Sequence, residues 1–195
     1  MNSNFWQLKQ GFILASGSPQ RRRLLQSVYL EPDAAVSPDI DECEQKGELP
    51  ARYVKRIAVQ KARAVFEQHP NKCVVAADTI LAVGRRVIRK AHTVEEAKAH
   101  LELLSGRTHR VITGLCVIAP DGRAITRVNS TSVKMKRLSK EDIDFILKTD
   151  EWKDVAGYRI EGIISAFIHR MNGSYDSVVG IPVYDVVHIL RGILG

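Results

Sequence analysis

The chain has 195 residues, 45% of them apolar and 26% charged, and its formal net charge at pH 7 is +7. This length and composition favour one folded domain, or two small lobes that share a core, and argue against disorder. No apolar run approaches the about 20 residues of a membrane-spanning helix, and the polar residues 1–10 lack the apolar stretch of a secretion signal. The three cysteines are widely spaced, which excludes a disulfide framework and favours the reducing cytoplasm.

The N-terminal region predicts a strand, a tight turn and a helix. Residues 11–16 are a short apolar run, and residues 20–28 carry apolar side chains on one helical face. Ser18 is a favoured N-cap, and Pro19 suits the first position of a helix. Residues 34–37 predict a second strand.

A long helix and a buried strand follow. Residues 49–68 keep apolar side chains at helical spacing, which predicts an amphipathic helix. Residues 72–78 predict a buried strand that ends at Asp78. Residues 79–83 and 86–90 then flank a two-residue turn, which predicts a hairpin.

The second half of the chain alternates helices with strands. Thr93 and Glu96 form a capping-box pattern that opens a helix, and Gly106 closes it. The remaining predicted elements are strands over residues 110–119, 123–137 and 163–171, and helices over residues 139–149 and 182–194. Helices mixed with several hairpins predict an α/β fold, in which a mixed central sheet is flanked by helices.

The positive net charge has two explanations. It is either a solvated basic surface or the sign of an anionic ligand, which would be a nucleic acid or a phosphorylated small molecule. The longest basic cluster is only Arg21-Arg22-Arg23, and no basic tract is interleaved with aromatic residues, so small phosphates are favoured. The sequence contains neither GxGxxG nor GxxxxGK[ST], which disfavours dinucleotide binding and P-loop chemistry.

The turn before the first helix has the features of an anion site. Backbone N–H groups at a helix start lack intrahelical partners, and the helix dipole favours an anion there. Arg21 and Arg22 lie in this first turn, where a cation is unfavourable unless a negative ligand is bound. The alternative is that Ser18 and Pro19 only cap the helix and that the arginines are solvated.

Three further features suggest chemistry. Lys61 lies inside the apolar stripe of its helix, so its ammonium either reaches solvent along the helix surface or points into a phosphate-binding cleft. Asp78 could act as a base or a metal ligand in a crevice, or only cap the next turn. Asp39, Asp41 and Glu42 form either a solvated acidic turn or half of a divalent-cation site.

Together these motifs resemble the Maf family of nucleoside triphosphate pyrophosphatases, which are also called septum-formation inhibitor-like proteins. The matching segments occur in family order over nearly the whole chain. They are Leu14-Ala15-Ser16-Gly17-Ser18-Pro19 with Arg21, Lys61-Ala62, Ala76-Ala77-Asp78-Thr79, Leu104-Ser105-Gly106 with His109, and residues 173–182.

The resemblance implies an inosine-triphosphatase-like architecture, with residues 1–195 forming one domain of two lobes around a central cleft, usually as a homodimer. It also implies Mg²⁺- or Mn²⁺-dependent hydrolysis of a nucleoside triphosphate to the monophosphate and pyrophosphate, including house-cleaning of non-standard nucleotides. By position, Asp78 matches the catalytic base or a metal ligand, and Glu42 matches an acidic metal ligand. The matching substrate-binding residues are Ser16, Ser18, Arg21, Lys61, Thr79 and Lys90.

Some positions depart from the family pattern. Gln20 stands where many members have Arg, and Glu161 replaces a common Gln. Asp78-Thr79-Ile80 resembles the branch that acts on dTTP and UTP, so we expect a pyrimidine substrate whose base is selected by Gln20 and Glu161.

Two other functions are compatible with the sequence. One is a nucleic-acid-binding module that uses the positive charge and needs no metal, and the other is division arrest through protein contacts. For the enzyme, Asp78→Asn should abolish activity and leave stability unchanged or higher, because a carboxylate close to Glu42 would lose its like-charge repulsion.

Overall fold

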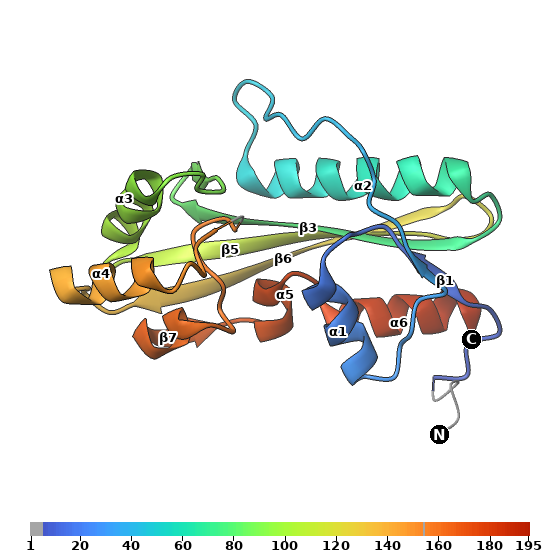
Figure 1. Ribbon diagram of the computed structural model, residues 1–195. Coiled ribbons are helices and arrows are strands. Elements are labelled where there is room, and N and C mark those ends of the chain that lie inside the picture. Colours follow the sequence, from blue (N-terminus) through green and yellow to red (C-terminus); the bar gives the residue numbers. More distant parts are fainter. Residues whose placement is uncertain (1–5, 154) are drawn as a thin grey trace.

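The computed structural model describes residues 6–153 and 155–195, so the first half of the polar start of the chain lies outside the described residues. Within the described part, seven strands form one sheet in the order β2-β1-β3-β5-β6-β7, and β4 pairs with β3 (Figure 1). Strand β1 pairs in parallel with β2 and β3, whereas the other pairs are antiparallel. The predicted mixed α/β class is confirmed. The strands are β1 (Phe12–Leu14), β2 (Ala34–Ala35), β3 (Cys73–Val83), β4 (Arg86–Ile88), β5 (Thr108–Ile118), β6 (Ala124–Met135) and β7 (Ile168–Asn172).

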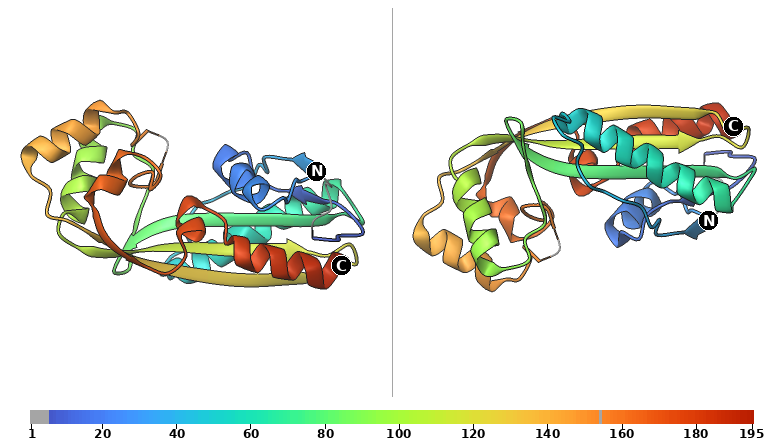
Figure 2. Two further views of the ribbon diagram at one scale, coloured as in Figure 1. Left: turned by 90° about the horizontal axis from the view of Figure 1, so that it is seen from below. Right: turned by 90° about the horizontal axis from the view of Figure 1, so that it is seen from above.

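Helices gather at the two ends of this sheet. The helices are α1 (Pro19–Ser27), α2 (Pro50–Gln68), α3 (Val94–Leu104), α4 (Lys140–Lys148), α5 (Tyr175–Val179) and α6 (Val183–Leu194), with a 3₁₀ turn η1 (Ile163–Phe167). At one end, α2 covers one face of the sheet and α1 with α6 covers the other. Helices α3 and α4 lie at the opposite end with η1 and β7 (Figure 2). None of the helices in residues 6–153 and 155–195 is long and apolar enough to cross a membrane.

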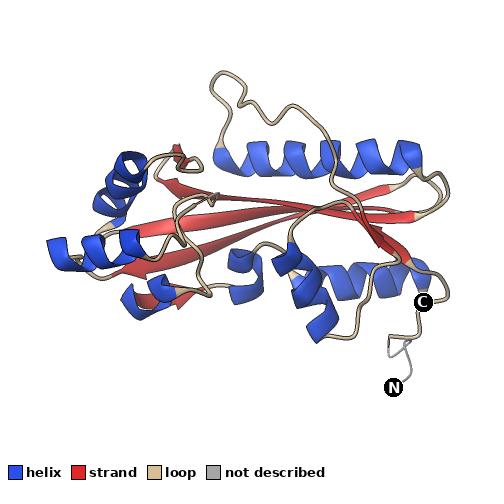
Figure 3. Cartoon of the chain, in the orientation of Figure 1, coloured by secondary structure: helices blue, strands red, loops and turns tan. Residues whose placement is uncertain are grey.

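Each end of the sheet has its own core. Phe12, Leu25 and Leu190 belong to the cluster that packs α1 and α6 on the sheet. Leu101 and Met135 belong to the cluster that joins α3 to the far end of the strands. The long strands β3, β5 and β6 run through both ends (Figure 3), so the middle of β3 lies between the two cores.

Strand β3 is longer than predicted. It pairs with β5 without interruption from Val74 opposite Ile118 to Ala82 opposite Arg110. The two strands expected over residues 72–78 and 79–83 are therefore one, and Asp78 lies in its middle rather than at its end. The backbone beyond Asp78 stays extended because β5 continues to offer hydrogen-bond partners along its whole length.

The prediction of a strand over residues 163–171 is correct only for its second half. The first half forms η1, and the Ile163 N–H donates to the Glu151 carboxylate at 2.6 Å instead of pairing in the sheet. The short helix α5 was not predicted, although Ser174 caps it by accepting a hydrogen bond from Ser177 N at 3.2 Å.

The helix starts follow their sequence signals. Ser18 caps α1, and Pro19 is the first helical residue, as predicted. Thr93 caps α3, but the Glu96 carboxylate accepts from His92 N at 2.8 Å, which differs from the expected return bond to Thr93.

Candidate active site

A cavity of about 1150 Å³ opens beside the middle of β3, where Asp78, Thr79 and Ile80 line it. Its walls are formed by the turn before α1, the acidic loop that contains Glu42 and Glu44, α2, β3, the β4 hairpin and residues 155–161. The structure brings ten predicted site residues to this one cavity: Ser16, Ser18, Gln20, Arg21, Glu42, Lys61, Asp78, Thr79, Lys90 and Glu161. Three other candidates, Arg22, Asp39 and Asp41, lie outside its lining, so of the three carboxylates in the acidic turn only Glu42 belongs to the site.

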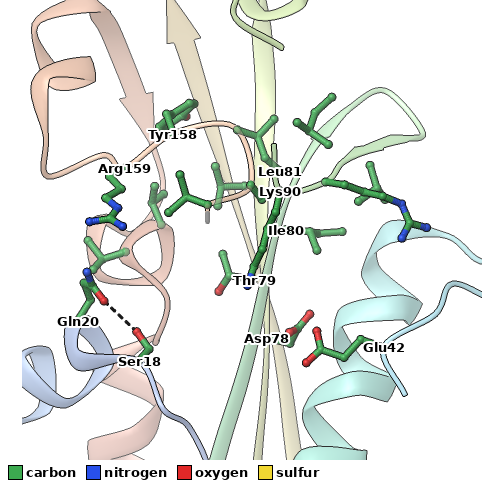
Figure 4. A pocket seen from close by; sticks show the side chains of 18 of the residues that line it. Ser18, Gln20, Glu42, Asp78, Thr79, Ile80, Leu81, Lys90, Tyr158 and Arg159 are labelled. Atoms are coloured by element: carbon green, nitrogen blue, oxygen red, sulfur yellow. Dashed lines mark hydrogen bonds between the residues drawn. The ribbon is translucent and has the colours of Figure 1, made fainter. Parts of the chain in front are cut away.

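An ion-pair cluster lies at one side of the cavity, with Lys61 and Asp78 buried and the Glu42 side chain 50% exposed. The Lys61 Nζ is 2.7 Å from Asp78 Oδ1 and 2.8 Å from Glu42 Oε1. Lys61 is only 9% exposed and Asp78 only 6%, so the ammonium does not reach bulk solvent. Of the two alternatives for Lys61, the structure therefore supports the cleft. Figure 4 shows the carboxylates of Asp78 and Glu42 turned toward each other.

Close packing of α2 on the sheet places Lys61 beside β3. Asp78 on β3 lies opposite Gly114 on β5. A Cβ atom at Gly114 would overlap the backbone carbonyl of Val54 on α2. Glycine thus lets the helix approach the strands closely, and the Lys61 side chain reaches the carboxylate on the neighbouring strand.

The start of α1 forms a positively polarised side of the cavity. Arg21 Nη1 donates to Ser16 Oγ at 3.0 Å, and Arg21 Nε donates to the Gly180 carbonyl at 2.8 Å. Burial lowers the pKa of Arg21, whereas the nearby charges of Asp78 and Glu42 raise it. A guanidinium stays charged in proteins, so a cation is held at the start of α1, where the Ser18 and Arg21 N–H groups donate to Ser16 Oγ and Ser18 Oγ.

Thr79 joins three elements. Its hydroxyl lies 2.9 Å from the Thr113 hydroxyl and 3.4 Å from the Gly180 carbonyl. Thr113 donates to the Ser177 carbonyl at 2.7 Å, so it accepts from Thr79. The Thr79 hydroxyl thus links β3 to β5 through a hydrogen bond, and Thr79 also lines the cavity.

Sequence reasoning did not identify the residues that hold the acidic loop in place. Tyr53 OH donates to the Glu42 carbonyl at 2.9 Å, and Arg56 Nη2 donates to the Cys43 carbonyl at 3.0 Å. Burial, with the charges of Asp78 and Glu42, raises the pKa of Tyr53 to about 12, so its proton stays in place at neutral pH. The signal in the sequence was a tyrosine one turn into the amphipathic helix, on the side that faces the loop.

Tyr158, which lines the cavity, forms a second pair that was not predicted, with the buried His109. His109 Nε2 lies 2.6 Å from Tyr158 OH, and their rings meet edge to face. Burial lowers the pKa of His109 to about 4 and raises the pKa of Tyr158, so both side chains are neutral at pH 7. The pair fixes the Tyr158 ring on the cavity wall.

The residues of the ion-pair cluster fit a divalent cation that is shared with a ligand. Within the described residues no group of three or more His, Cys, Asp and Glu side chains could hold a metal unaided. Asp78 and Glu42, however, both approach one Nζ within 2.8 Å, so their oxygens lie close together. Mg²⁺ typically takes one or two carboxylates and completes its shell with water and substrate phosphates.

Fold and cavity together define a mixed α/β protein whose cleft combines the carboxylates of Asp78 and Glu42 with several cations. The family model described as "Maf-like protein" matches residues 11–193. The chain belongs to the Maf family.

Curated relatives match the chain over nearly its whole length. It is 45% identical to the "dTTP/UTP pyrophosphatase" of Caulobacter vibrioides over 182 residues, which cover 93% of this chain and 94% of the relative. It is 44% identical to the "Nucleoside triphosphate pyrophosphatase" of Anaplasma phagocytophilum, with 92% of this chain and 94% of the relative covered.

Solved structures show weaker similarity. A Ham1 protein from Coxiella burnetii aligns with a TM-score of 0.47 and 17% identity, covering 67% of this chain and 75% of that chain. A dITP/XTP pyrophosphatase from Mycobacterium abscessus aligns with a TM-score of 0.42 and 18% identity, covering 66% and 76%. The mixed α/β class rests on the sheet order itself.

Proposed function

We propose that this protein is a nucleoside triphosphate pyrophosphatase that hydrolyses a pyrimidine nucleotide, dTTP or UTP, to the monophosphate and pyrophosphate. The observation that carries the proposal is the ion-pair cluster of Lys61, Asp78 and Glu42, which shares a cavity with Arg21 and the start of α1. The relatives named dTTP/UTP pyrophosphatase, at 41% to 45% identity, support the same activity and the same bases.

Asp78 and Glu42 would hold a divalent cation, Mg²⁺ or Mn²⁺, together with phosphate oxygens of the substrate. When bound, this cation supplies a Lewis acid that stabilises charge on those oxygens. Without the cation, the Lys61 ammonium pairs with both carboxylates and balances one of their two negative charges. With the cation held by Asp78 and Glu42, the ammonium would be free to bind phosphate.

The chain's own residues then divide the remaining tasks. An Asp78 carboxylate oxygen that does not hold the cation accepts the proton of the attacking water. The oxygen of this water forms a bond to the α-phosphorus. The bond from that phosphorus to the bridging oxygen breaks, and pyrophosphate leaves with the bonding electrons. Arg21, Lys61 and Lys90 neutralise the charge that moves onto this leaving group. Ser16, Ser18 and Thr79 present hydroxyl groups along the cavity near the helix start.

Base selection would fall to Gln20 and Glu161, both of which line the cavity. A neutral amide and a carboxylate offer hydrogen-bond donors and acceptors suited to the edge of a heterocycle. The single-domain organisation, the dimer and the cytoplasmic location that the family resemblance implies stay predictions, which light scattering and cell fractionation would test.

A panel of common and modified nucleoside triphosphates, each with Mg²⁺ or Mn²⁺, tests the activity. We expect dTTP and UTP to give the monophosphate and pyrophosphate, and we expect chelation of the metal to stop the reaction. Asp78→Asn should remove at least 99% of the rate, because it removes both a proton acceptor and a metal ligand; such losses are typically on the order of 100-fold or more.

Asp39→Asn is the matched control, since Asp39 is exposed and lies outside the cavity lining. It should keep wild-type turnover. Release of orthophosphate would contradict the proposal. Absence of turnover across the panel would also contradict it, and would favour the alternative of division arrest through protein contacts.

A further inference from the structure

The cavity has two chemically different sides. Asp78 and Glu42 lie on one side, and Tyr158 and Arg159 lie on the other (Figure 4). The Tyr158 side is apolar, since Tyr158, Ile160 and Val178 pack in one hydrophobic cluster and also line the cavity. A nucleotide has the same division between a charged triphosphate and a flat, largely apolar base.

Arg159 is the cation on this apolar side, and its guanidinium has few partners. Its Nε is buried and has no hydrogen-bond partner in the described part of the chain. Its Nη2 makes one long hydrogen bond, of 3.5 Å, to the Lys153 carbonyl. None of the ion pairs among the described residues involves Arg159. A half-buried donor group without an acceptor is costly unless a ligand supplies one.

The segment that carries Arg159 is fixed to the cavity wall. Ala156 forms a β-bridge with Lys90, and Tyr158 OH is held by His109 at 2.6 Å. Gly157 has φ +82°, and a Cβ there would lie 3.0 Å from the Leu81 side chain. Arg159 is thus presented by a positioned backbone, which lowers the entropy cost of binding a ligand.

Gln20 faces Arg159 and adds a second donor. Ser18 Oγ donates to Gln20 Oε1 at 3.2 Å, which leaves the amide NH₂ as the free end. Figure 4 shows this nitrogen directed toward Arg159. Uracil and thymine carry two keto oxygens that flank a ring N–H, so two donors match their edge. Cytosine replaces one keto oxygen with an amino group, which would place a donor against a donor.

The carboxylate of Glu161 argues that this side receives a base rather than a phosphate. Glu161 lines the same cavity two residues after Arg159. Its charge would repel phosphate oxygens, whereas it would accept a hydrogen bond from a ring N–H.

We propose that Arg159 is a specificity-determining residue that donates a hydrogen bond to a keto oxygen of uracil or thymine and so discriminates against cytosine. This inference rests on the proposed pyrophosphatase function and names the residue that selects its base.

The test compares kcat/KM for UTP and CTP in the wild-type protein and in Arg159→Met, which keeps the aliphatic stem and removes the donors. We expect the UTP-to-CTP ratio to fall about 10- to 100-fold, the usual worth of a charged hydrogen bond. Arg159→Glu, which offers an acceptor, should move the ratio further toward CTP. Arg85→Met is the matched control, because Arg85 is an exposed turn residue outside the cavity lining, and its ratio should stay that of the wild type.

A second readout separates this inference from the proposed function. Calorimetric titration with UMP and CMP should show tighter binding of UMP by the wild-type protein and loss of that preference in Arg159→Met. An unchanged UTP-to-CTP ratio, or an unchanged UMP-to-CMP preference, in a folded Arg159→Met protein would overturn the role of Arg159. Absence of pyrophosphate release from the wild-type protein, with the UMP preference still dependent on Arg159, would instead overturn the pyrophosphatase function alone.

Discussion

At the scale of single residues, the central feature is a lysine ammonium held between two carboxylates. Lys61 and Asp78 are both buried, and Glu42 closes the cluster from the acidic loop. The sequence suggested repulsion between Asp78 and Glu42, but the ammonium between them converts that repulsion into two attractions. Removing one partner of a buried pair typically costs about 3–5 kcal/mol, because the other charge is left uncompensated.

Lys61→Met should therefore lower the free energy of unfolding by about 3 kcal/mol in metal-free buffer, since two carboxylates lose their shared cation. The loss should be smaller when Mn²⁺ is added, because the cation replaces the missing charge. Urea unfolding with and without Mn²⁺ measures both effects.

Asp78→Asn is the companion variant. It should cost about 1 kcal/mol, a typical hydrogen bond, because Lys61 keeps Glu42 as its partner. This reverses the sign expected from the sequence. The double variant Lys61→Met/Asp78→Asn should be more stable than Lys61→Met alone, because it lacks the buried carboxylate that has lost its cation. Equal stability of Lys61→Met and the wild-type protein would show that the ion-pair cluster does not contribute to the free energy of unfolding.

His109 gives the protein a pH-dependent stability. Burial lowers its pKa from 6.5 to about 4, so the unfolded chain binds a proton more readily than the folded one between these values. The free energy of unfolding is therefore not reduced by His109 above about pH 6.5, and it decreases as the pH falls from 6.5 toward 4. The loss between pH 7 and pH 5 is about 2 kcal/mol, at 1.36 kcal/mol per pKa unit.

The neutral variant His109→Gln should lack this part of the pH dependence. Urea midpoints at pH 7 and pH 5 measure it, and carboxylates elsewhere contribute equally to both proteins. Identical pH slopes for the two proteins would show that the burial of His109 does not control its protonation.

At the scale of secondary-structure elements, the close contact between α2 and the sheet brings Lys61 within reach of Asp78. An added Cβ at Gly114 has no room against the Val54 carbonyl, whereas an added Cβ at Gly192, inside α6, meets nothing within 4 Å. The same glycine-to-alanine change is therefore expected to lower stability at Gly114 and to raise it at Gly192.

Gly114→Ala should destabilise the protein by about 3 kcal/mol, because overpacking against backbone forces the helix away from the strands. Gly192→Ala should stabilise it by about 0.5–1 kcal/mol, the usual gain from alanine in a helix. Thermal unfolding of both variants tests this, and a Gly114→Ala protein as stable as wild type would mean that α2 adjusts freely.

At the scale of the whole molecule, β3, β5 and β6 connect the two ends. Because these strands run through both cores, neither end can lose its packing without disturbing the other. The two ends should therefore unfold in one cooperative transition.

The two tryptophans of the chain report on opposite ends. Trp6 packs against the core of α1 and α6, and Trp152 packs beside Ala91 and Ala97 of the α3 end. Trp6→Phe leaves one fluorophore and Trp152→Phe leaves the other. We expect the same urea midpoint from both, after correction for the stability of each variant by circular dichroism, and separate midpoints would show two independent units.

The sequence predicted features that depend on neighbours along the chain. Ser18 and Pro19 specify the start of α1, and periodic apolar residues specify α2, because capping and amphipathicity are local properties. Short motifs also indicated the residues that line the cavity. The prediction was wrong for residues 163–167 because a side chain 12 positions away, Glu151, captures the Ile163 N–H.

Only the tertiary structure decided how these residues meet. Lys61 and Asp78 pair across 17 positions, His109 and Tyr158 across 49, and Arg21 and Gly180 across 159. Such contacts follow from strand register and from the close approach of α2, which no local pattern encodes. The sequence by itself determined which groups are present and in which elements, whereas the fold determined which charges are buried together, because burial and pairing depend on segments that are distant along the chain.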